Sequence, residues 1–151
     1  MDFRTELQPE PSAWKVGYRD VVFSVGSCFA VHTGQKLLDY KFHALVNPFG
    51  TIYNPVSLYQ SIEMALTGIP LADDGFVQNQ GSVRHFDLHS EISAPSEKAL
   101  RQFYSSRCET VARHLRGATL LIITFGTASV FHHRQRRRVV ANCHKMPGTL
   151  F

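Results

Sequence analysis

A serine in this sequence stands at a point where a nucleophile would be effective. Ser27 comes one residue after the uncharged run VVFSV, and apolar residues at helical spacing begin at Phe29. A serine at such a strand-to-helix turn lies near backbone N–H groups and the positive end of the helix dipole, and both stabilise a developing oxyanion. Ser27 is therefore a candidate nucleophile for attack on an acyl carbonyl.

Two other interpretations of this turn stay open. Serine is among the preferred N-cap residues, so Ser27 can simply cap the helix that follows it. The neighbouring Cys28 is a rival nucleophile, because a helix N-terminus favours the thiolate form of cysteine. A cysteine among apolar residues is, however, often a small buried hydrophobic residue. We favour Ser27 over Cys28 as the nucleophile.

Three loops that follow predicted strands carry small and polar residues. In an open α/β sheet the ligand site lies beyond the carboxyl ends of the strands, where such loops converge. The first loop holds Ser27, the second runs from Asn47 to Gly50, and the third runs from Gly126 to Ala128. We therefore expect these loops to line one cleft, with Asn47, Gly50, Gly126 and Thr127 as its lining residues.

Short uncharged segments alternate along the chain with segments whose apolar residues recur every three or four positions. The first kind predicts strands covered on both faces, and the second predicts amphipathic helices. The alternation predicts an α/β fold of three layers, with a mostly parallel sheet and helices on both faces. The runs 21–25 and 118–124 are predicted to be buried, neighbouring parallel strands. A further strand is predicted at 43–46, and helices at 29–40, 56–66 and 95–117.

Three segments stand outside this alternation. Residues 1–19 contain two prolines and no apolar periodicity, which predicts an extended lead-in before a domain at 20–151. Residues 70–92 are mixed in character and predict an irregular insertion over the sheet. Two β-like segments, 129–133 and 138–141, predict a hairpin around a solvated basic turn or, as the alternative, a surface for an anionic ligand. The basic residues of this run are Arg134, Arg136, Arg137 and Arg138.

The composition is that of an ordinary globular protein, with 44% hydrophobic and 19% charged residues, which excludes wholesale disorder. The net charge of +4 is concentrated in the arginine run, and no nucleic-acid motif accompanies it. We therefore expect no nucleic-acid partner. The sequence has no signal-like or membrane-spanning apolar stretch, so we expect no membrane association. Composition leaves the oligomeric state open.

The cysteines and histidines form no recognisable metal or disulfide pattern. The three cysteines include no C-x-x-C pair, which favours a reducing, cytoplasmic setting. The histidine spacings match no closed zinc pattern, so we expect no metal and no cofactor. The residues concerned are Cys28, Cys108, Cys143, His85, His89, His132 and His133.

Five short strings of residues follow one another along the sequence. The first is the pentapeptide Gly26 to Ala30, which reads G-S-C-F-A. The others are Asn47-Pro48-Phe49-Gly50 with Tyr53-Asn54-Pro55, Phe86 to Ser90, Phe125-Gly126-Thr127-Ala128, and Ala141-Asn142-Cys143-His144-Lys145 with Pro147. Together they resemble the motifs of the GSCFA family, which is named for the first of them. The resemblance covers about residues 20 to 151.

The GSCFA family is similar to the SGNH, or GDSL-like, hydrolases. This resemblance implies an SGNH hydrolase-like, flavodoxin-like fold, with Ser27 as the nucleophile and Gly50 as an oxyanion glycine. It places Gly126 and Thr127 near the third motif block, where Thr127 replaces the usual asparagine and alters the oxyanion arrangement. It also implies that Asn142 and His144 approach the site.

The general base of SGNH-like catalysis comes from a D-x-x-H motif late in the chain. No aspartate in this sequence is followed three residues later by a histidine. We therefore expect residues 20–151 to be the N-terminal part of a GSCFA domain, with an incomplete fold. Because loss of one triad member costs orders of magnitude in rate, we expect little activity from this part alone.

Two functions are compatible with these observations. The first is a serine hydrolase that acts on ester bonds, with an acyl or acetyl ester of a small molecule or glycan as substrate. The second is a non-catalytic binding module that uses the same strand-end pocket, with the arginine run recognising an anionic or glycan ligand. The residues do not specify the substrate further.

Overall fold

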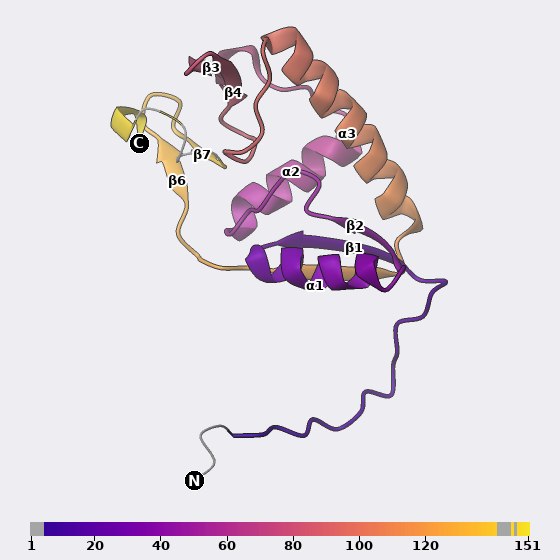
Figure 1. Cartoon of the computed structure of the whole chain (residues 1–151). Coiled ribbons are helices and arrows are strands. Elements are labelled where there is room, and N and C mark those ends of the chain that lie inside the picture. Colours follow the sequence, from indigo (N-terminus) through magenta and orange to yellow (C-terminus); the bar gives the residue numbers. More distant parts are fainter. Residues whose placement is uncertain (1–4, 142–145, 147) are drawn as a thin grey trace.

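The computed structural model describes residues 5–141, 146 and 148–151. Residues 5–19 form no helix or strand, nearly all of them are exposed, and Figure 1 shows this segment running away from the rest of the chain. The segment contacts the fold near its end, where the rings of Tyr18 and Phe42 stack with centroids 4.6 Å apart. The parts that position a site therefore begin at the first strand.

Three parallel strands form the central sheet, in the order β2-β1-β5. The middle strand is β1 (Val21–Gly26), which pairs with β2 (His43–Val46) on one side and β5 (Leu120–Thr124) on the other. The predicted parallel pairing of the first and last of these strands is confirmed. The ends of β1 and β5 lie level, because Gly26 is in register with Thr124.

Helices lie on both faces of this sheet. Figure 1 shows α1 (Cys28–Asp39) on one face, with α2 (Pro55–Thr67) and α3 (Glu97–Gly117) on the other. On the α1 side the packing is close, because a Cβ atom added at Gly34 would lie 2.6 Å from the side chain of Val46 in β2. The predicted α/β fold of three layers, with a mostly parallel sheet, is confirmed.

The prediction that both central runs are buried is wrong for β5. β1 is buried from its second residue onward because strands flank both of its edges and helices cover both of its faces. β5 forms an edge of the sheet, and its Leu121 and Ile123 are 53% and 45% exposed. These two side chains are in register with Phe23 and Val25, so they lie on the same face, where the helix layer leaves β5 uncovered.

The helices begin and end at residues with capping chemistry. The side chain of Asn54 accepts the N–H of Ser57 at 2.8 Å, and Gly68, with φ 70°, ends α2 in the left-handed conformation. Ser96 caps α3 by accepting the N–H of Ala99 at 3.2 Å. Such caps satisfy backbone groups that a helix leaves unpaired, so the helices lie close to their predicted ranges. None of the helices that the structure describes combines the length and the hydrophobicity of a membrane span.

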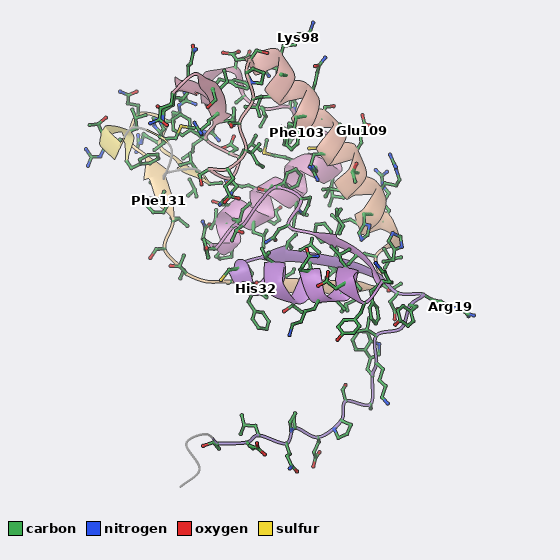
Figure 2. The ribbon with its side chains drawn as sticks, in the orientation of Figure 1. Arg19, His32, Lys98, Phe103, Glu109 and Phe131 are labelled. Atoms are coloured by element: carbon green, nitrogen blue, oxygen red, sulfur yellow. The ribbon has the colours of Figure 1, made fainter. Side chains whose placement is uncertain are left out.

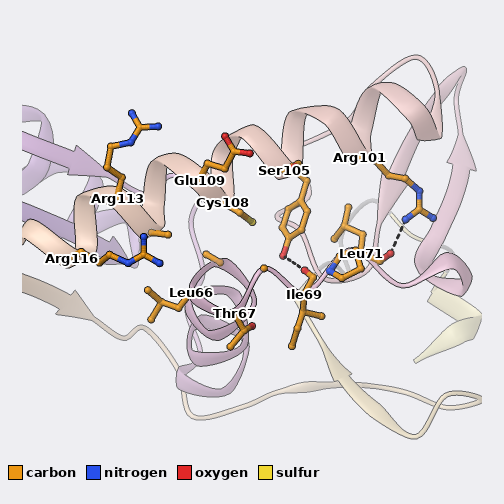
Figure 3. Close-up of a pocket in the computed structure, with 15 residues that line it drawn as sticks. Leu66, Thr67, Ile69, Leu71, Arg101, Ser105, Cys108, Glu109, Arg113 and Arg116 are labelled. Atoms are coloured by element: carbon orange, nitrogen blue, oxygen red, sulfur yellow. Dashed lines mark hydrogen bonds between the residues drawn. The ribbon is translucent and has the colours of Figure 1, made fainter.

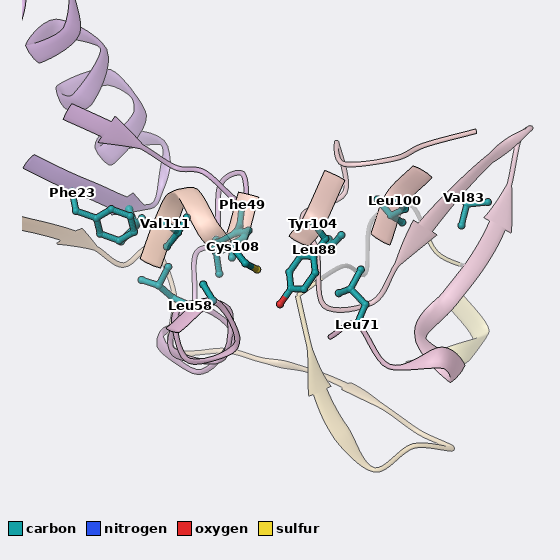
Figure 4. Close-up of a cluster of buried hydrophobic side chains, with 13 residues drawn as sticks. Phe23, Phe49, Leu58, Leu71, Val83, Leu88, Leu100, Tyr104, Cys108 and Val111 are labelled. Atoms are coloured by element: carbon teal, nitrogen blue, oxygen red, sulfur yellow. The ribbon is translucent and has the colours of Figure 1, made fainter. Parts of the chain in front are cut away.

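One apolar cluster joins the sheet to α2, α3 and the insertion that lies between these two helices in the chain. α3 contributes residues at three- and four-residue intervals, which place them on one face of the helix. Figure 4 shows this face lying between the sheet and the insertion. The cluster includes Phe23, Phe49, Leu58, Leu71, Val83, Leu88, Leu100, Tyr104, Cys108 and Val111.

The segment predicted as irregular contains a hairpin, so that prediction is partly wrong. A single turn, η1 (Asp73–Gly75), leads into β3 (Phe76–Asn79), which pairs antiparallel with β4 (Ser82–His85). The two residues between the strands, Gln80 and Gly81, both have positive φ angles. That conformation is typical of the tightest β-hairpin turns.

The hairpin predicted near the C-terminus is confirmed. β6 (Phe131–His133) pairs antiparallel with β7 (Arg138–Val140), and the turn η2 (Gly148–Leu150) lies beside it. The N–H of Arg134 donates to the carbonyl of Leu150 at 3.0 Å.

The sequence predicts a solvated basic turn for this hairpin. In the structure, two of its arginines form ion pairs instead. Arg138 forms an ion pair with Asp87 at 2.6 Å, and Arg136 forms one with Asp74 at 3.2 Å. The guanidinium of Arg136 also lies 4.8 Å from the centre of the Phe86 ring. Two of the arginines therefore tie the hairpin to the insertion, because the insertion supplies acidic partners that local sequence does not reveal.

Candidate active site

Ser27 lies at the junction of β1 and α1 and caps the helix. Its backbone is extended, with φ −71° and ψ 178°, and its Oγ accepts the N–H of Phe29 at 3.3 Å. Ser27 is only 6% exposed. The N-cap interpretation therefore describes its local structure, and any reaction at Ser27 requires a substrate to reach a nearly buried hydroxyl.

Gly26 brings the end of β1 very close to the end of β5. Its φ angle is 128°, and a Cβ atom at this position would lie 1.9 Å from the carbonyl oxygen of Thr124. Only glycine fits such a conformation and such an approach. The approach allows the N–H of Ser27 to donate to the Thr124 carbonyl at 3.0 Å.

Thr124 contacts Ser27 directly, although it is not among the site residues predicted from the sequence. The two hydroxyl oxygens, Ser27 Oγ and Thr124 Oγ1, are 2.9 Å apart, and either can donate. The N–H of Ser27 also lies 3.0 Å from Thr124 Oγ1. A sequence signal was present, because Thr124 is the polar last residue of an otherwise apolar strand, at the sheet edge where ligand sites form.

Asn47 joins the loop after β2 to the end of β1. Its Oδ1 accepts the N–H of Gly26 at 2.8 Å, and its Nδ2 donates to the Gly26 carbonyl at 3.3 Å. Its own N–H donates to the carbonyl of Ser24 at 2.8 Å. Asn47 thus lies beside the Ser27 turn and fixes the backbone that precedes the serine.

Gly50 lies at the end of the same loop, against the insertion. Its φ angle is 81°, and a Cβ atom added there would lie 2.5 Å from the Cβ of His89. The N–H of Gly50 donates to the carbonyl of Asn47 at 2.9 Å. The donor that the family resemblance assigns to an oxyanion is therefore used inside the loop.

The loop after β5 is held by one carbonyl. The N–H groups of Gly126 and Thr127 donate to the carbonyl of Tyr53 at 2.9 Å and 3.3 Å. Gly126 also permits the Tyr53 ring to approach, since a Cβ atom there would lie 2.6 Å from the ring. This contact gives Tyr53, in the string Tyr53-Asn54-Pro55, a structural role that its sequence position alone did not predict.

The candidate loops therefore lie against one another, but their backbone donors are already bonded. The N–H groups of Ser27, Gly50, Gly126 and Thr127 all donate to protein oxygens. An oxyanion hole needs N–H groups aimed at the position that the oxyanion will occupy. In this arrangement an acyl oxygen would have to displace one of the protein acceptors.

A cavity of about 600 Å³ opens beside Cys28. Asn47 and Gly50 line it together with Cys28, and His32 follows Cys28 by one helical turn. Figure 2 shows His32 on α1. Ser27 is not among the residues that line this cavity, since its hydroxyl points to Thr124, whereas Cys28 is exposed. The rival nucleophile is thus the more accessible of the two.

Within the described residues, no imidazole or carboxylate is hydrogen-bonded to Ser27. His85 Nε2 lies 3.0 Å from the Ala72 carbonyl, and burial lowers the pKa of His85. His114 Nε2 lies 2.8 Å from the Val22 carbonyl. Neither is a base for Ser27 in this arrangement. Asn142 and His144, which the resemblance places near the site, lie outside the described residues.

The described part of the chain contains no group of three or more histidine, cysteine, aspartate or glutamate side chains that could hold a metal ion. The polar groups around Ser27 are hydroxyls, one amide side chain and backbone groups. Such a set can form hydrogen bonds to a hydroxyl oxygen, and that oxygen can act as a nucleophile.

The sequence model of the GSCFA family matches residues 21–151. The match begins at β1 and takes in the whole sheet, the helices and both hairpins. The chain therefore belongs to the GSCFA family. Searches of curated proteins and of solved structures found no match.

Proposed function

We propose that this protein is a serine hydrolase that acts on ester bonds, with Ser27 as its nucleophile. The observation that carries the proposal is the position of the Ser27 hydroxyl at the strand-to-helix turn, 2.9 Å from the Thr124 hydroxyl and 3.3 Å from the Phe29 nitrogen. The resemblance of the GSCFA family to SGNH hydrolases supports the same role.

In the proposed reaction Ser27 Oγ attacks the acyl carbon of an ester. The ester C–O bond breaks, the alcohol leaves with a proton, and water then releases the carboxylate and restores the serine. The Phe29 N–H and the Thr124 hydroxyl can both donate to Ser27 Oγ as it loses its proton. Thr124 thus stabilises the alkoxide and orients it.

Two further groups are needed for this chemistry. The oxyanion requires hydrogen-bond donors. We propose N–H groups in the first turn of α1, the Ser27 N–H and Asn47 Nδ2, and the last two must first release the protein oxygens to which they now donate. The base must come from outside the present hydrogen-bond partners of Ser27. Gly50, Gly126, Thr127, Asn142 and His144 remain proposed contributors to the site.

The proposal also implies a partner and a setting. The substrate is a small-molecule or glycan ester, and attack by a serine hydroxyl with an imidazole base uses no cofactor. We propose a cytoplasmic setting, because Cys28 and Cys108 are free thiols, as is usual in reducing compartments.

A non-catalytic binding module is the second candidate. The bonded N–H groups of Gly50, Gly126 and Thr127 favour it, because they are not aimed at an oxyanion. The cavity beside Cys28, lined also by His32, Gln35 and Glu91, would then hold a glycan through hydrogen bonds. The arginine run contributes less to this candidate than its charge suggests, since two of its members pair with aspartates.

Labelling with a fluorophosphonate probe tests the proposal. We expect the full-length protein to be labelled covalently, Ser27→Ala to abolish labelling, and the matched variant Cys28→Ser to leave it largely intact. Both substitutions are small and neighbouring, so circular dichroism spectra and thermal unfolding serve as the folding control. A phosphonate adduct mapped to Ser27 by mass spectrometry completes the assignment.

Two outcomes contradict the proposal in different ways. Labelling that survives Ser27→Ala and is lost in Cys28→Ser reassigns the nucleophile to the more exposed cysteine. A folded protein that is not labelled, and that binds an oligosaccharide panel, supports the binding module instead.

A further inference from the structure

A groove separate from the Ser27 site lies between α2 and α3. It has a volume of about 680 Å³ and runs between the C-terminal turn of α2, the segment 68–71 and one side of α3. Figure 3 shows the groove along α3, from Arg101 at one end to Arg116 at the other. Its volume lies within the range of small-molecule sites, roughly 300–1,000 Å³.

The floor and one wall of this groove are apolar. Tyr104, Cys108 and Ala112 of α3 are buried at its base. Leu66 and Ile69 on the α2 side remain 45% and 49% exposed. Covering these two side chains with an apolar ligand would remove area from water at roughly 25 cal/mol per Å².

The hydroxyl on the floor and one hydroxyl on the α2 side are already bonded within the protein. The Tyr104 hydroxyl donates to the Ile69 carbonyl at 3.4 Å, and the Thr67 hydroxyl donates to the Glu63 carbonyl at 2.7 Å. A peptide laid here would lose hydrogen bonds to water without replacement, which is costly, whereas an acyl chain has none to lose. The floor therefore favours a hydrocarbon chain.

The two ends of the groove differ in their charge. Arg101 at one end is bonded to the Leu71 carbonyl and to Asp73. At the other end, Arg113 and Arg116 form no ion pair with any residue that the structure describes, and Glu109 is the one acidic lining residue. In Figure 3 the Arg116 side chain extends toward Leu66, so a guanidinium lies beside the apolar wall.

We propose that this groove binds an acyl chain with an anionic head group, and that Arg116 holds the head group. A guanidinium matches a carboxylate with two parallel hydrogen bonds, which makes Arg116 suitable for a fatty carboxylate. The chain lies over Leu66 and Ile69 toward Cys108, a distance of about 12 Å along α3 from Arg116 at the usual helical rise. This site does not depend on the chemistry proposed for Ser27.

Titration of the whole chain with dodecanoate below its micelle concentration tests this proposal. Calorimetry and amide NMR shifts should report saturable 1:1 binding with shifts on α2 and α3. Arg116→Gln should weaken binding about tenfold, the effect of losing one charge-assisted pair, and Arg116→Lys should weaken it less. Leu66→Asp should also weaken binding, because it places a charge on the apolar wall. Lys36→Gln, which also removes one positive charge but lies on α1 on the other face of the sheet, should leave the affinity unchanged.

Further ligands test whether the head group must be anionic, and they distinguish a free acyl chain from a membrane surface. Dodecyl sulfate should bind and a dodecyl trimethylammonium ion should not, because the head group must be anionic. Binding of vesicles with anionic lipids, without binding of free dodecanoate, would identify a membrane surface and overturn the free-ligand site. Equal binding by Arg116→Gln, equal binding of the cationic chain, or binding of an acidic peptide alone would each overturn the proposal. The Arg116 substitutions lie on an exposed turn, so loss of folding is not expected.

Discussion

β1 and β5 are neighbours with similar sequences and different surroundings. Both are uncharged runs, and a glycine followed by a hydroxyl residue stands at the end of β1 and two residues after the end of β5. β1 is central and buried, while β5 forms an edge and exposes Leu121 and Ile123. The comparison shows that position in the sheet, not apolar composition, decides how much of a strand is covered.

The turn after β1 is held by more contacts than the turn after β5, just as β1 is more covered than β5. The turn at Ser27 is bonded to Thr124 on one side and, through Gly26, to Asn47 on the other. The turn at Gly126 is bonded to a single carbonyl, that of Tyr53, and is exposed. A site built on these turns therefore has a fixed part at Ser27 and a more adaptable part at Gly126 and Thr127.

The largest difference in unfolding free energy is expected between substitutions at Gly26 and at Gly126. Gly26→Ala should lower the free energy of unfolding by more than about 4 kcal/mol, because its Cβ would meet a backbone carbonyl at a strained φ angle. Gly126→Ala should cost less than about 2 kcal/mol, because its Cβ meets the half-exposed ring of Tyr53, which can move. Urea unfolding followed by circular dichroism measures both. Equal costs would show that the two turns are held equally firmly.

Apolar truncation on one face of the sheet should give the next largest difference. Phe23→Ala should cost about 3–5 kcal/mol, because Phe23 is 1% exposed and lies in the main core. Leu121→Ala, at the position paired with it in register, should cost only about 1 kcal/mol, since half of its side chain is already in water. Urea unfolding of the pair checks this, and a large loss for Leu121→Ala would mean that another molecule covers β5.

The contact between the strand ends can be tested through the rate of fluorophosphonate labelling. Thr124→Val should slow labelling of Ser27 about tenfold and shift its pH profile upward, because the alkoxide loses a hydroxyl donor. Thr124→Ser keeps the hydroxyl and should label within a few-fold of the wild-type rate. If Thr124→Val labels as fast as the wild type, Thr124 only positions the backbone of the turn.

The smallest difference concerns the hydroxyl residues after the two glycines. Ser27→Ala should cost about 1 kcal/mol of unfolding free energy, because α1 loses its N-cap acceptor. Thr127→Ala should change stability by less than about 0.5 kcal/mol, because its hydroxyl accepts only the exposed N–H of Ser129. Thermal unfolding of both variants checks this order, and a reversed order would contradict the view that the Ser27 turn is the better fixed.

Local patterns in the sequence were sufficient for most of the fold. Apolar runs, helical spacing and caps such as Asn54 and Ser96 depend on neighbouring residues, so the three main strands, the three helices and the C-terminal hairpin lie close to their predicted ranges. The hairpin of β3 and β4 was missed because its strands are short and mixed in character. The sequence also contained Ser27, Asn47 and Gly50, whose loops the structure brings to one edge of the sheet.

What the sequence determined by itself is the order of elements and the presence of a serine at a strand-to-helix turn, because these follow from local spacing. Tertiary structure alone decided which strand lies at the edge, which arginines find aspartates, and that Ser27 contacts Thr124 across 97 positions of sequence. These features depend on pairing between distant segments, and a run of residues carries no information about which distant run will lie beside it. The same reason explains why the bonded donors at Gly50 and Gly126 became visible only in the folded chain.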